Sequence, residues 1–180
     1  VKTGRVHTTF NQTIASTGAC TGVLGNYVSL ASATDNCTAT GAITITQSPA
    51  AGNVIASATT VTITATDAAG NSSTCTFLVT PVDNTAPSIT CPAAQTLTLS
   101  ATCAGVLPDY TSLATVSDNC TPSASIVVTQ SPAIGSAVSS VGTTTITLTA
   151  TDAAGNASTC TFNVNRVDTT LPTITCPANI

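Results

Sequence analysis

The sequence is poor in charge and in aromatic residues. Only 6% of its 180 residues are charged, all seven acidic residues are Asp, and Met and Trp are absent. With three Lys and Arg residues there is no basic patch to neutralise a phosphate backbone, and with 3% aromatic residues there is no platform for stacking bases. The composition therefore argues against nucleic acid as a partner.

Long apolar runs are also missing, although 42% of the residues are hydrophobic. No stretch approaches the roughly 18 consecutive apolar residues that a membrane-spanning helix needs. The apolar residues alternate with Thr and Ser, which make up about a third of the chain. Alternation with period two predicts half-buried strands, and β-branched Thr suits their solvent face. We expect an all-β chain without a membrane span.

The cysteines lack the spacing of a metal site. There are eight Cys but no CxxC pair, and His7 is the single histidine, so neither a zinc site nor a haem attachment is indicated. Cysteines spread through a β-rich chain predict disulfides and an oxidising, extracellular or cell-surface location. The sequence begins at Val1 without a signal peptide, which we interpret as a mature form or a fragment.

An internal repeat organises the sequence. The motif TATDAAGN at 64–71 recurs unchanged at 149–156, and PSITCPA at 87–93 recurs as PTITCPA at 172–178. These copies are 85 residues apart, and Asp-Asn-Cys at 35–37 recurs 83 residues later at 118–120. Repeats at this spacing predict tandem domains. The predicted parts are a first repeat at 1–82 with an atypical first strand, a second repeat at 83–167, and a linker with an opening strand at 168–180.

Strand signals in the second repeat indicate a β-sandwich. Ile146, Leu148 and Ala150 alternate with Thr and should share a buried face, with Tyr110 and Phe162 as large core residues. Turn motifs separate the segments. We predict two tandem immunoglobulin-like antiparallel β-sandwich domains of about seven strands each. The clearest predicted strands of the second repeat are 88–91, 95–100, 126–129, 143–151 and 158–165.

One known family resembles this pattern. The succession PSITCPA, Cys103, SDNC, QSPAIGS, VGTTTITLTATDAAGN and STCTF resembles the hyalin repeat, or HYR domain. The resemblance covers residues 86–167, extends with a weaker start over 15–80, and begins again at 171–180. It implies a β-sandwich of adhesive or repetitive surface proteins without catalytic activity. The first repeat departs from the pattern, because Thr8 stands where Cys91 and Cys176 stand.

Disulfide pairing can be predicted only by analogy between the repeats and by proximity, since sequence alone does not fix connectivity. Each predicted link would stabilise the fold by about 3 to 4 kcal/mol in the chain-entropy model. The predicted pairs are Cys37–Cys75, Cys120–Cys160 and Cys91–Cys103.

Two further cysteines suggest a link between subunits. Cys20 matches Cys103 but has no predicted partner in its repeat, and Cys176 belongs to the opening strand of a further repeat. We predict that 171–180 adds as a strand to the first repeat of the next subunit, with Cys176 bonded to Cys20. Such head-to-tail contacts propagate into a fibre. Alternatively, the chain is part of a longer repeat array and Cys176 bonds to a downstream cysteine.

The acidic residues lie in turn motifs, where Asp commonly accepts hydrogen bonds from the local backbone. No DxDxDG loop is present and His7 has no catalytic context, so we predict no metal, no cofactor and no enzymatic activity. Calcium is the competing interpretation for the turns and linkers. Its candidate ligands are Asp67, Asn71, Asp83, Asp152, Asn156 and Asp168.

Together these patterns predict an extracellular structural protein that forms a disulfide-stabilised filament, stalk or adhesin shaft. Its partners would be copies of itself or neighbouring repeats of a longer chain. The alternative is an adhesin module that binds a carbohydrate or protein ligand.

Overall fold

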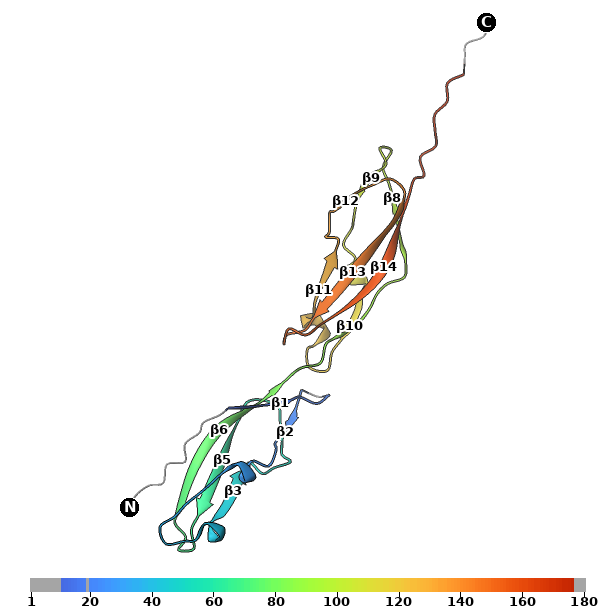
Figure 1. The fold of residues 1–180 in the computed structure, drawn as a ribbon. Helices are drawn as coiled ribbons and strands as arrows, with labels where there is room; N and C mark the ends of the chain where they lie inside the picture. Colours follow the sequence, from blue (N-terminus) through green and yellow to red (C-terminus); the bar gives the residue numbers. More distant parts are fainter. Residues whose placement is uncertain (1–10, 19, 177–180) are drawn as a thin grey trace. The chain divides into compact units, whose positions relative to one another are not determined.

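The computed structural model describes residues 11–18 and 20–176, in two compact units, Val1–Asn84 and Thr85–Ile180 (Figure 1). Both units are built from β-strands, and the helical elements of the described residues are short 3₁₀ helices. None of the helices in the described residues is long and apolar enough to cross a membrane.

The first unit contains a four-stranded sheet in the order β1-β6-β5-β3 and the small pair β2-β4. Its Tyr27 and Phe77 rings pack edge to face with centroids 5.1 Å apart. The elements are β1 (Gln12–Ala15), β2 (Gly22–Val23), η1 (Val28–Leu30), η2 (Thr40–Ala42), β3 (Thr44–Ser48), β4 (Val54–Ile55), β5 (Thr59–Thr66) and β6 (Ser72–Val82).

The second unit repeats this plan with the sheet β11-β13-β14-β8 and the pairs β10-β7 and β12-β9. The elements are β7 (Ser88–Thr90), β8 (Gln95–Thr98), β9 (Ala104–Val106), η3 (Thr111–Leu113), β10 (Thr115–Ser117), η4 (Ser123–Ser125), β11 (Val127–Ser131), β12 (Ala137–Ser139), β13 (Gly142–Thr151) and β14 (Ala157–Val167).

The β-sandwich prediction is confirmed, but the pairing is not purely antiparallel. In both units an early strand runs parallel to the closing strand, as β1 does with β6 and β8 with β14. The early strand and the closing strand both run toward the end at which the chain leaves the unit, so they pair in the same direction. The remaining strand pairs are antiparallel.

The predicted core face of the second unit is confirmed. Ile146, Leu148 and Ala150 on β13 are completely buried. Tyr110 and Phe162 pack edge to face, with ring centroids 5.3 Å apart, in the same core cluster. Aromatic pairs of this geometry add to the stability gained from burial alone. Each unit therefore has its own core around one Tyr–Phe pair.

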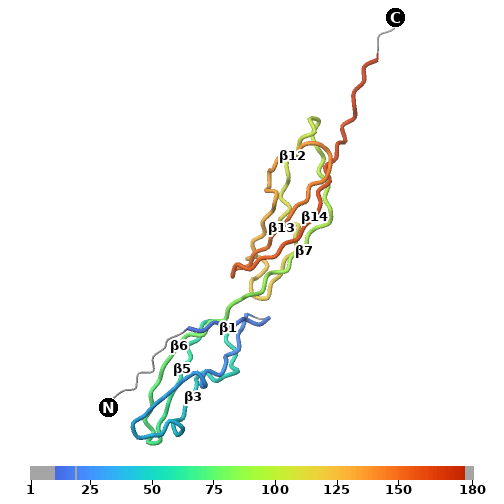
Figure 2. The backbone as a smooth tube through the Cα atoms, viewed as in Figure 1, coloured from blue at the N-terminus to red at the C-terminus, as the bar shows by residue number. Residues whose placement is uncertain are grey.

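The chain crosses the second unit from end to end. The Ser158 hydroxyl donates a hydrogen bond to the Pro87 carbonyl where β14 begins, and Leu99 N donates to Val167 O where it ends, at 2.9 Å. β14 has 11 residues, so these two ends lie about 33 Å apart at about 3.3 Å per residue. Figure 2 shows the chain entering at one end of this unit and leaving at the other.

Candidate functional site

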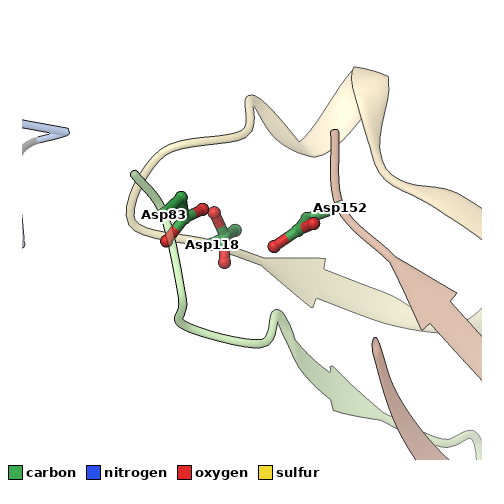
Figure 3. Close-up of side chains that lie close together, drawn as sticks. All are labelled: Asp83, Asp118 and Asp152. Atoms are coloured by element: carbon green, nitrogen blue, oxygen red, sulfur yellow. The ribbon is translucent and has the colours of Figure 1, made fainter. Parts of the chain in front are cut away.

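Three carboxylates converge at the N-terminal end of the second repeat (Figure 3). Each of them directly follows a strand: Asp83 follows β6, Asp118 follows β10, and Asp152 follows β13. One oxygen from each carboxylate lies within 4.8 Å of the others. Residues far apart in sequence thus form one acidic cluster, Asp83/Asp118/Asp152.

Local hydrogen bonds fix the carboxylates of Asp118 and Asp152. Oδ2 of Asp118 accepts hydrogen bonds from the backbone N–H groups of Cys120 and Thr121, both at 2.8 Å. Asp152 is only 6% exposed. Its two oxygens accept hydrogen bonds from the backbone N–H and the side-chain amide of Asn156, each at 2.8 Å. The turns thus hold the carboxylates in place instead of leaving them mobile.

Asp152 remains ionised despite its burial. Burial raises the pKa of its carboxyl, but this is outweighed by the hydrogen bonds from the Asn156 side chain and from backbone amides of the turn. The net effect is a pKa below the usual value of 3.8. A negative charge therefore sits in the cluster at neutral pH.

No positive side chain of the described residues balances the cluster. Arg166, the only Lys, Arg or His that the structure describes, lies near the far end of β14 and donates to Ser139 O at 2.7 Å. Oδ1 of Asp118 is shut off from solvent and accepts no hydrogen bond. A buried, unsatisfied carboxylate oxygen is costly. Carboxylate oxygens gathered in this way are the ligands that calcium prefers.

The structure groups the predicted calcium candidates differently from the sequence. Asp83 and Asp152 meet, and Asn156 orients Asp152. Asp67 and Asn71 form the matching turn of the first unit, hydrogen-bonded to each other. Asp168 lies beyond β14, where its Oδ1 accepts from Thr170 N at 2.9 Å.

Sequence reasoning missed Asp118 as a candidate ligand. The signal was present, because the tripeptide Asp-Asn-Cys occurs in both repeats, at 35–37 and 118–120. We interpreted it as turn capping, which explains only one of the two Asp118 oxygens. His7 lies outside the described residues.

The disulfide of the second repeat joins Cys91 to Cys160, with Cα atoms 5.7 Å apart. The predicted pairs Cys91–Cys103 and Cys120–Cys160 are therefore wrong. β8 carries the chain away from Cys91 toward the far end of β14, so Cys103 lies at that end despite its proximity in sequence. Cys91 instead packs beside Cys160 against the core. Cys120 is itself in a disulfide.

The first repeat has no equivalent link in the described structure. Cys37 is exposed, Cys75 is half-buried on β6, and both are free thiols, so the predicted Cys37–Cys75 bond is absent. The predicted Cys20–Cys176 pair is also corrected, because Cys20 is already in a disulfide. Cys176 is exposed and free.

A small, shallow groove lies beside Cys75. The segment 31–33, which forms one wall, lies in no strand of the described structure. Its counterpart in the second repeat is β10, which is covered by β7. We call this feature the Cys75 groove. It is lined by 31–33, Ile45, Ile63, Ala65, Ser73 and Cys75.

The family comparison covers the whole acidic cluster. The sequence model of the HYR domain matches residues 82–166. This part of the chain is a HYR domain. HYR domains are immunoglobulin-like repeats of extracellular, adhesion-type proteins, as the resemblance implied.

A relative supports the same family. Hyalin of Strongylocentrotus purpuratus is 39% identical over 130 residues, which cover 68% of this chain and 10% of hyalin. The chain thus spans about a tenth of that relative's length. The match extends beyond the length of a single HYR domain.

Solved structures show more distant likeness. PcdhgB3 EC1-4 has a TM-score of 0.41 at 13% identity, covering 87% of this chain and 48% of that chain. Human CDH23 EC21-23 has a TM-score of 0.34 at 10% identity, covering 87% and 67%. Sidekick-1 immunoglobulin domains 1-4 have a TM-score of 0.29 at 9% identity, covering 88% and 50%.

Proposed function

We propose that this chain is part of an extracellular structural shaft, a stalk or filament in which HYR-type repeats follow one another end to end. The observation that carries the proposal is the path of the chain through the second repeat, which enters at one end of β14 and leaves at the other. A repeat of this kind transmits tension along its length. The role is structural, and it requires no catalytic step.

The Cys91–Cys160 disulfide suits this role. It ties the segment after β7 to the closing strand β14, next to the buried core. Tension applied at the N-terminal end therefore reaches β14 through a covalent bond. The strands that lie between Cys91 and Cys160 in the sequence do not carry this tension. In the chain-entropy model, closing a loop of this length stabilises the repeat by about 4 kcal/mol.

Electron microscopy tests the shaft directly. Negatively stained native material should show thin, regular fibres or rods with a repeat set by the length of one HYR-type unit. Isolated monomers that bind a carbohydrate or a protein would instead support the adhesin-module alternative.

We also propose that the acidic cluster Asp83/Asp118/Asp152 holds calcium, which would fix the segment before β7 to the two turns. The specific observation is the solvent-excluded Oδ1 of Asp118, which accepts no hydrogen bond and lies among three carboxylates. Calcium takes oxygen ligands in flexible geometries, and extracellular modules bind it in the range of about 0.1–1 mM.

The calcium proposal is tested by melting the intact chain in CaCl₂, in MgCl₂ and in EDTA. Saturating calcium should raise the melting temperature of the second repeat by at least about 5 °C, and magnesium should do less. Asp118→Asn should abolish the shift. Asp35→Asn, the matching change in the first repeat, should leave it intact.

The EDTA arm separates ligation from a purely structural role. Without calcium, Asp118→Asn should melt no lower than the unmodified chain, since it relieves repulsion between like charges. A variant equally destabilised in EDTA and in calcium would assign Asp118 to turn capping alone. No calcium shift in the unmodified chain, or an equal shift with magnesium, would overturn the assignment.

A further inference from the structure

Two kinds of turn carry a cysteine at the same position in both repeats. One kind precedes β2 and β9 and contains Cys20 or Cys103. Both cysteines have a positive φ, 56° and 54°, and each backbone N–H donates to the carbonyl three residues earlier, at 3.0 and 2.8 Å. Each turn lies beside the end of a closing strand, where Leu99 N donates to Val167 O and the first repeat makes the same contact. We call the turns that carry Cys20 and Cys103 the exit turns.

The other kind of turn contains the tripeptide Asp-Asn-Cys, at 35–37 and 118–120. In both turns Oδ2 of the aspartate accepts hydrogen bonds from the N–H groups of the cysteine and of the threonine after it. The Asn side chain donates to the cysteine Sγ, at 3.3 Å in Cys37 and 3.0 Å in Cys120. The threonine hydroxyl accepts from the turn that opens the closing strand. Each Asp-Asn-Cys turn therefore lies at the end of its repeat opposite the exit turn.

The bonding of these four cysteines differs between the repeats. Cys20 and Cys120 are each in a disulfide, whereas their counterparts Cys103 and Cys37 are exposed, free thiols. The backbone and the hydrogen bonds around each pair of counterparts are alike. Both kinds of turn thus hold the cysteine in a conformation that is compatible with a disulfide, and Cys103 and Cys37 present it at the surface.

We propose that Cys103 forms a disulfide with the cysteine of an Asp-Asn-Cys turn in an adjacent HYR-type repeat. In a second copy of this chain that cysteine is Cys37. The inference rests on the proposed shaft, because repeats that follow one another end to end bring the exit turn of one to the Asp-Asn-Cys turn of the next. A disulfide needs Cα atoms about 4.4–6.8 Å apart, which exposed turns at two abutting ends can reach.

Both turns are ordered before the bond forms. Cys103 O accepts a hydrogen bond from Ser140 N at 3.0 Å, and Oδ2 of Asp35 accepts one from the N–H of Cys37 at 2.9 Å. A backbone that is already ordered loses less conformational entropy on association. The link joins opposite ends of two repeats, so it does not close on itself and extends the shaft in one direction.

The covalent step needs an oxidant, which we take to be a small-molecule disulfide such as oxidised glutathione. The thiolate of Cys103 attacks one sulfur of the oxidant and expels one small thiol. The thiolate of Cys37 then attacks the Cys103 sulfur of the mixed disulfide and expels the second small thiol. Two protein thiols become one disulfide, and their two electrons and two protons leave on the two small thiols.

The test uses the full chain in a background that carries Cys75→Ser and Cys176→Ser, which removes the two other free thiols that the structure describes. With oxidised glutathione, this background should give a ladder of multimers on a non-reducing gel. Cys103→Ser and Cys37→Ser should each give monomer when oxidised alone, since each lacks one half of the link. A mixture of the two variants should give a dimer and nothing larger, because one chain supplies Cys37 and the other supplies Cys103.

The two single variants also act as controls for random oxidation. Both should melt as the background does, because Cys37 and Cys103 are exposed and form no disulfide within the monomer. A dimer of Cys37→Ser chains alone would mean that Cys103 bonds to itself and would overturn the inference. A mixture that stays monomeric would also overturn it, since the pairing belongs to the two turns.

Peptide mapping of native material without reduction identifies the source of the partner. A Cys103 peptide joined to the Cys37 peptide assigns the partner to a second copy, and one joined to another Asp-Asn-Cys peptide assigns it to a further repeat of a longer chain. A Cys103 that iodoacetamide alkylates before reduction, in material that forms fibres, would overturn this inference and leave the shaft standing. Isolated monomers with a free Cys103 would overturn both.

Discussion

The two repeats share a fold and differ at two places that decide what each can do alone. In the second repeat Cys91 closes a disulfide onto β14, and in the first repeat the matching thiol, Cys75, is free beside an open groove. The sequence difference is Thr8 in place of a cysteine. This one difference removes from the first repeat the sulfur that Cys160 bonds in the second.

The acidic turns show the same contrast. Asp35 and Asp67 match Asp118 and Asp152. The Asn71 side chain lowers the pKa of Asp67 through a hydrogen bond, and the charge of Asp35 opposes this only weakly. Asp35 is exposed, so water can solvate its carboxylate, whereas Oδ1 of Asp118 is shut off from solvent and accepts no hydrogen bond.

The largest expected effect on stability comes from removing the Cys91–Cys160 disulfide. Cys160→Ser should lower the free energy of unfolding of the second repeat by about 4 kcal/mol, because it opens the loop that the disulfide closes. The matching change in the first repeat, Cys75→Ser, should cost about 1 kcal/mol, because Cys75 packs against the core but closes no disulfide. Urea unfolding of the two variants measures both values.

That comparison has a built-in control. Adding a reductant to the unmodified chain should lower the free energy of unfolding of the second repeat by the same amount as Cys160→Ser does. The reductant should not change the unfolding of the second repeat in the Cys160→Ser variant. Equal destabilisation by Cys160→Ser and Cys75→Ser would contradict the contrast between the repeats.

An intermediate effect is expected where the repeats are alike. Gln130 accepts a hydrogen bond from Tyr110 N at 2.9 Å and donates to two carbonyls, and Gln47 does the same with Tyr27 N at 2.8 Å. Replacing either Gln with Ala leaves these backbone groups without their partner. Each change should cost about 1–3 kcal/mol.

The two Gln variants should be matched in size when unfolding of each repeat is followed separately by hydrogen exchange. Gln130→Glu and Gln47→Glu are the controls, because they keep the acceptor oxygen but lose the donor. A loss of stability in one repeat alone would show that the two repeats depend on this Gln to different extents despite their common fold.

The smallest expected effect is a dependence on acid that is common to both repeats. The hydrogen bond from the Asn71 side chain is the main cause of the lowered pKa of Asp67, and in Asp152 similar bonds outweigh burial. A carboxyl whose folded pKa lies below the unfolded value contributes stability above that value and loses it as pH falls through the folded pKa. The melting temperature should therefore be flat from pH 7 to about pH 5 and fall below about pH 4.

Scanning calorimetry across this range in EDTA checks the prediction, and Asn156→Ala should reduce the acid dependence of the second repeat alone. A melting temperature that rises as pH falls from 5 to 3 would contradict the assigned direction of these pKa shifts.

Local patterns in the sequence predicted the strands with clear alternation and the residues that they bury. β13 was predicted within one residue at its start, and its buried face was confirmed. β10 and β12 were missed, because three residues are too few to show a period. Local patterns also do not show that β8 runs parallel to β14.

The candidate sites depend on contacts between distant segments, which explains why they were predicted less well. Cys91 and Cys103 are 12 residues apart, yet the intervening strand separates them, whereas Cys91 and Cys160 are 69 residues apart and bonded. The acidic cluster joins the ends of three strands from positions 83, 118 and 152. The sequence shows each of these three Asp residues, but it does not show that their carboxylates lie close together.

Peptide mapping of the protein without reduction tests the central contrast between the repeats most directly. The account predicts one linked pair of peptides that joins Cys91 to Cys160, and a Cys75 peptide whose free thiol is alkylated by iodoacetamide before any reduction. A Cys75 joined to Cys37, or a Cys91 joined to Cys103, would contradict the account.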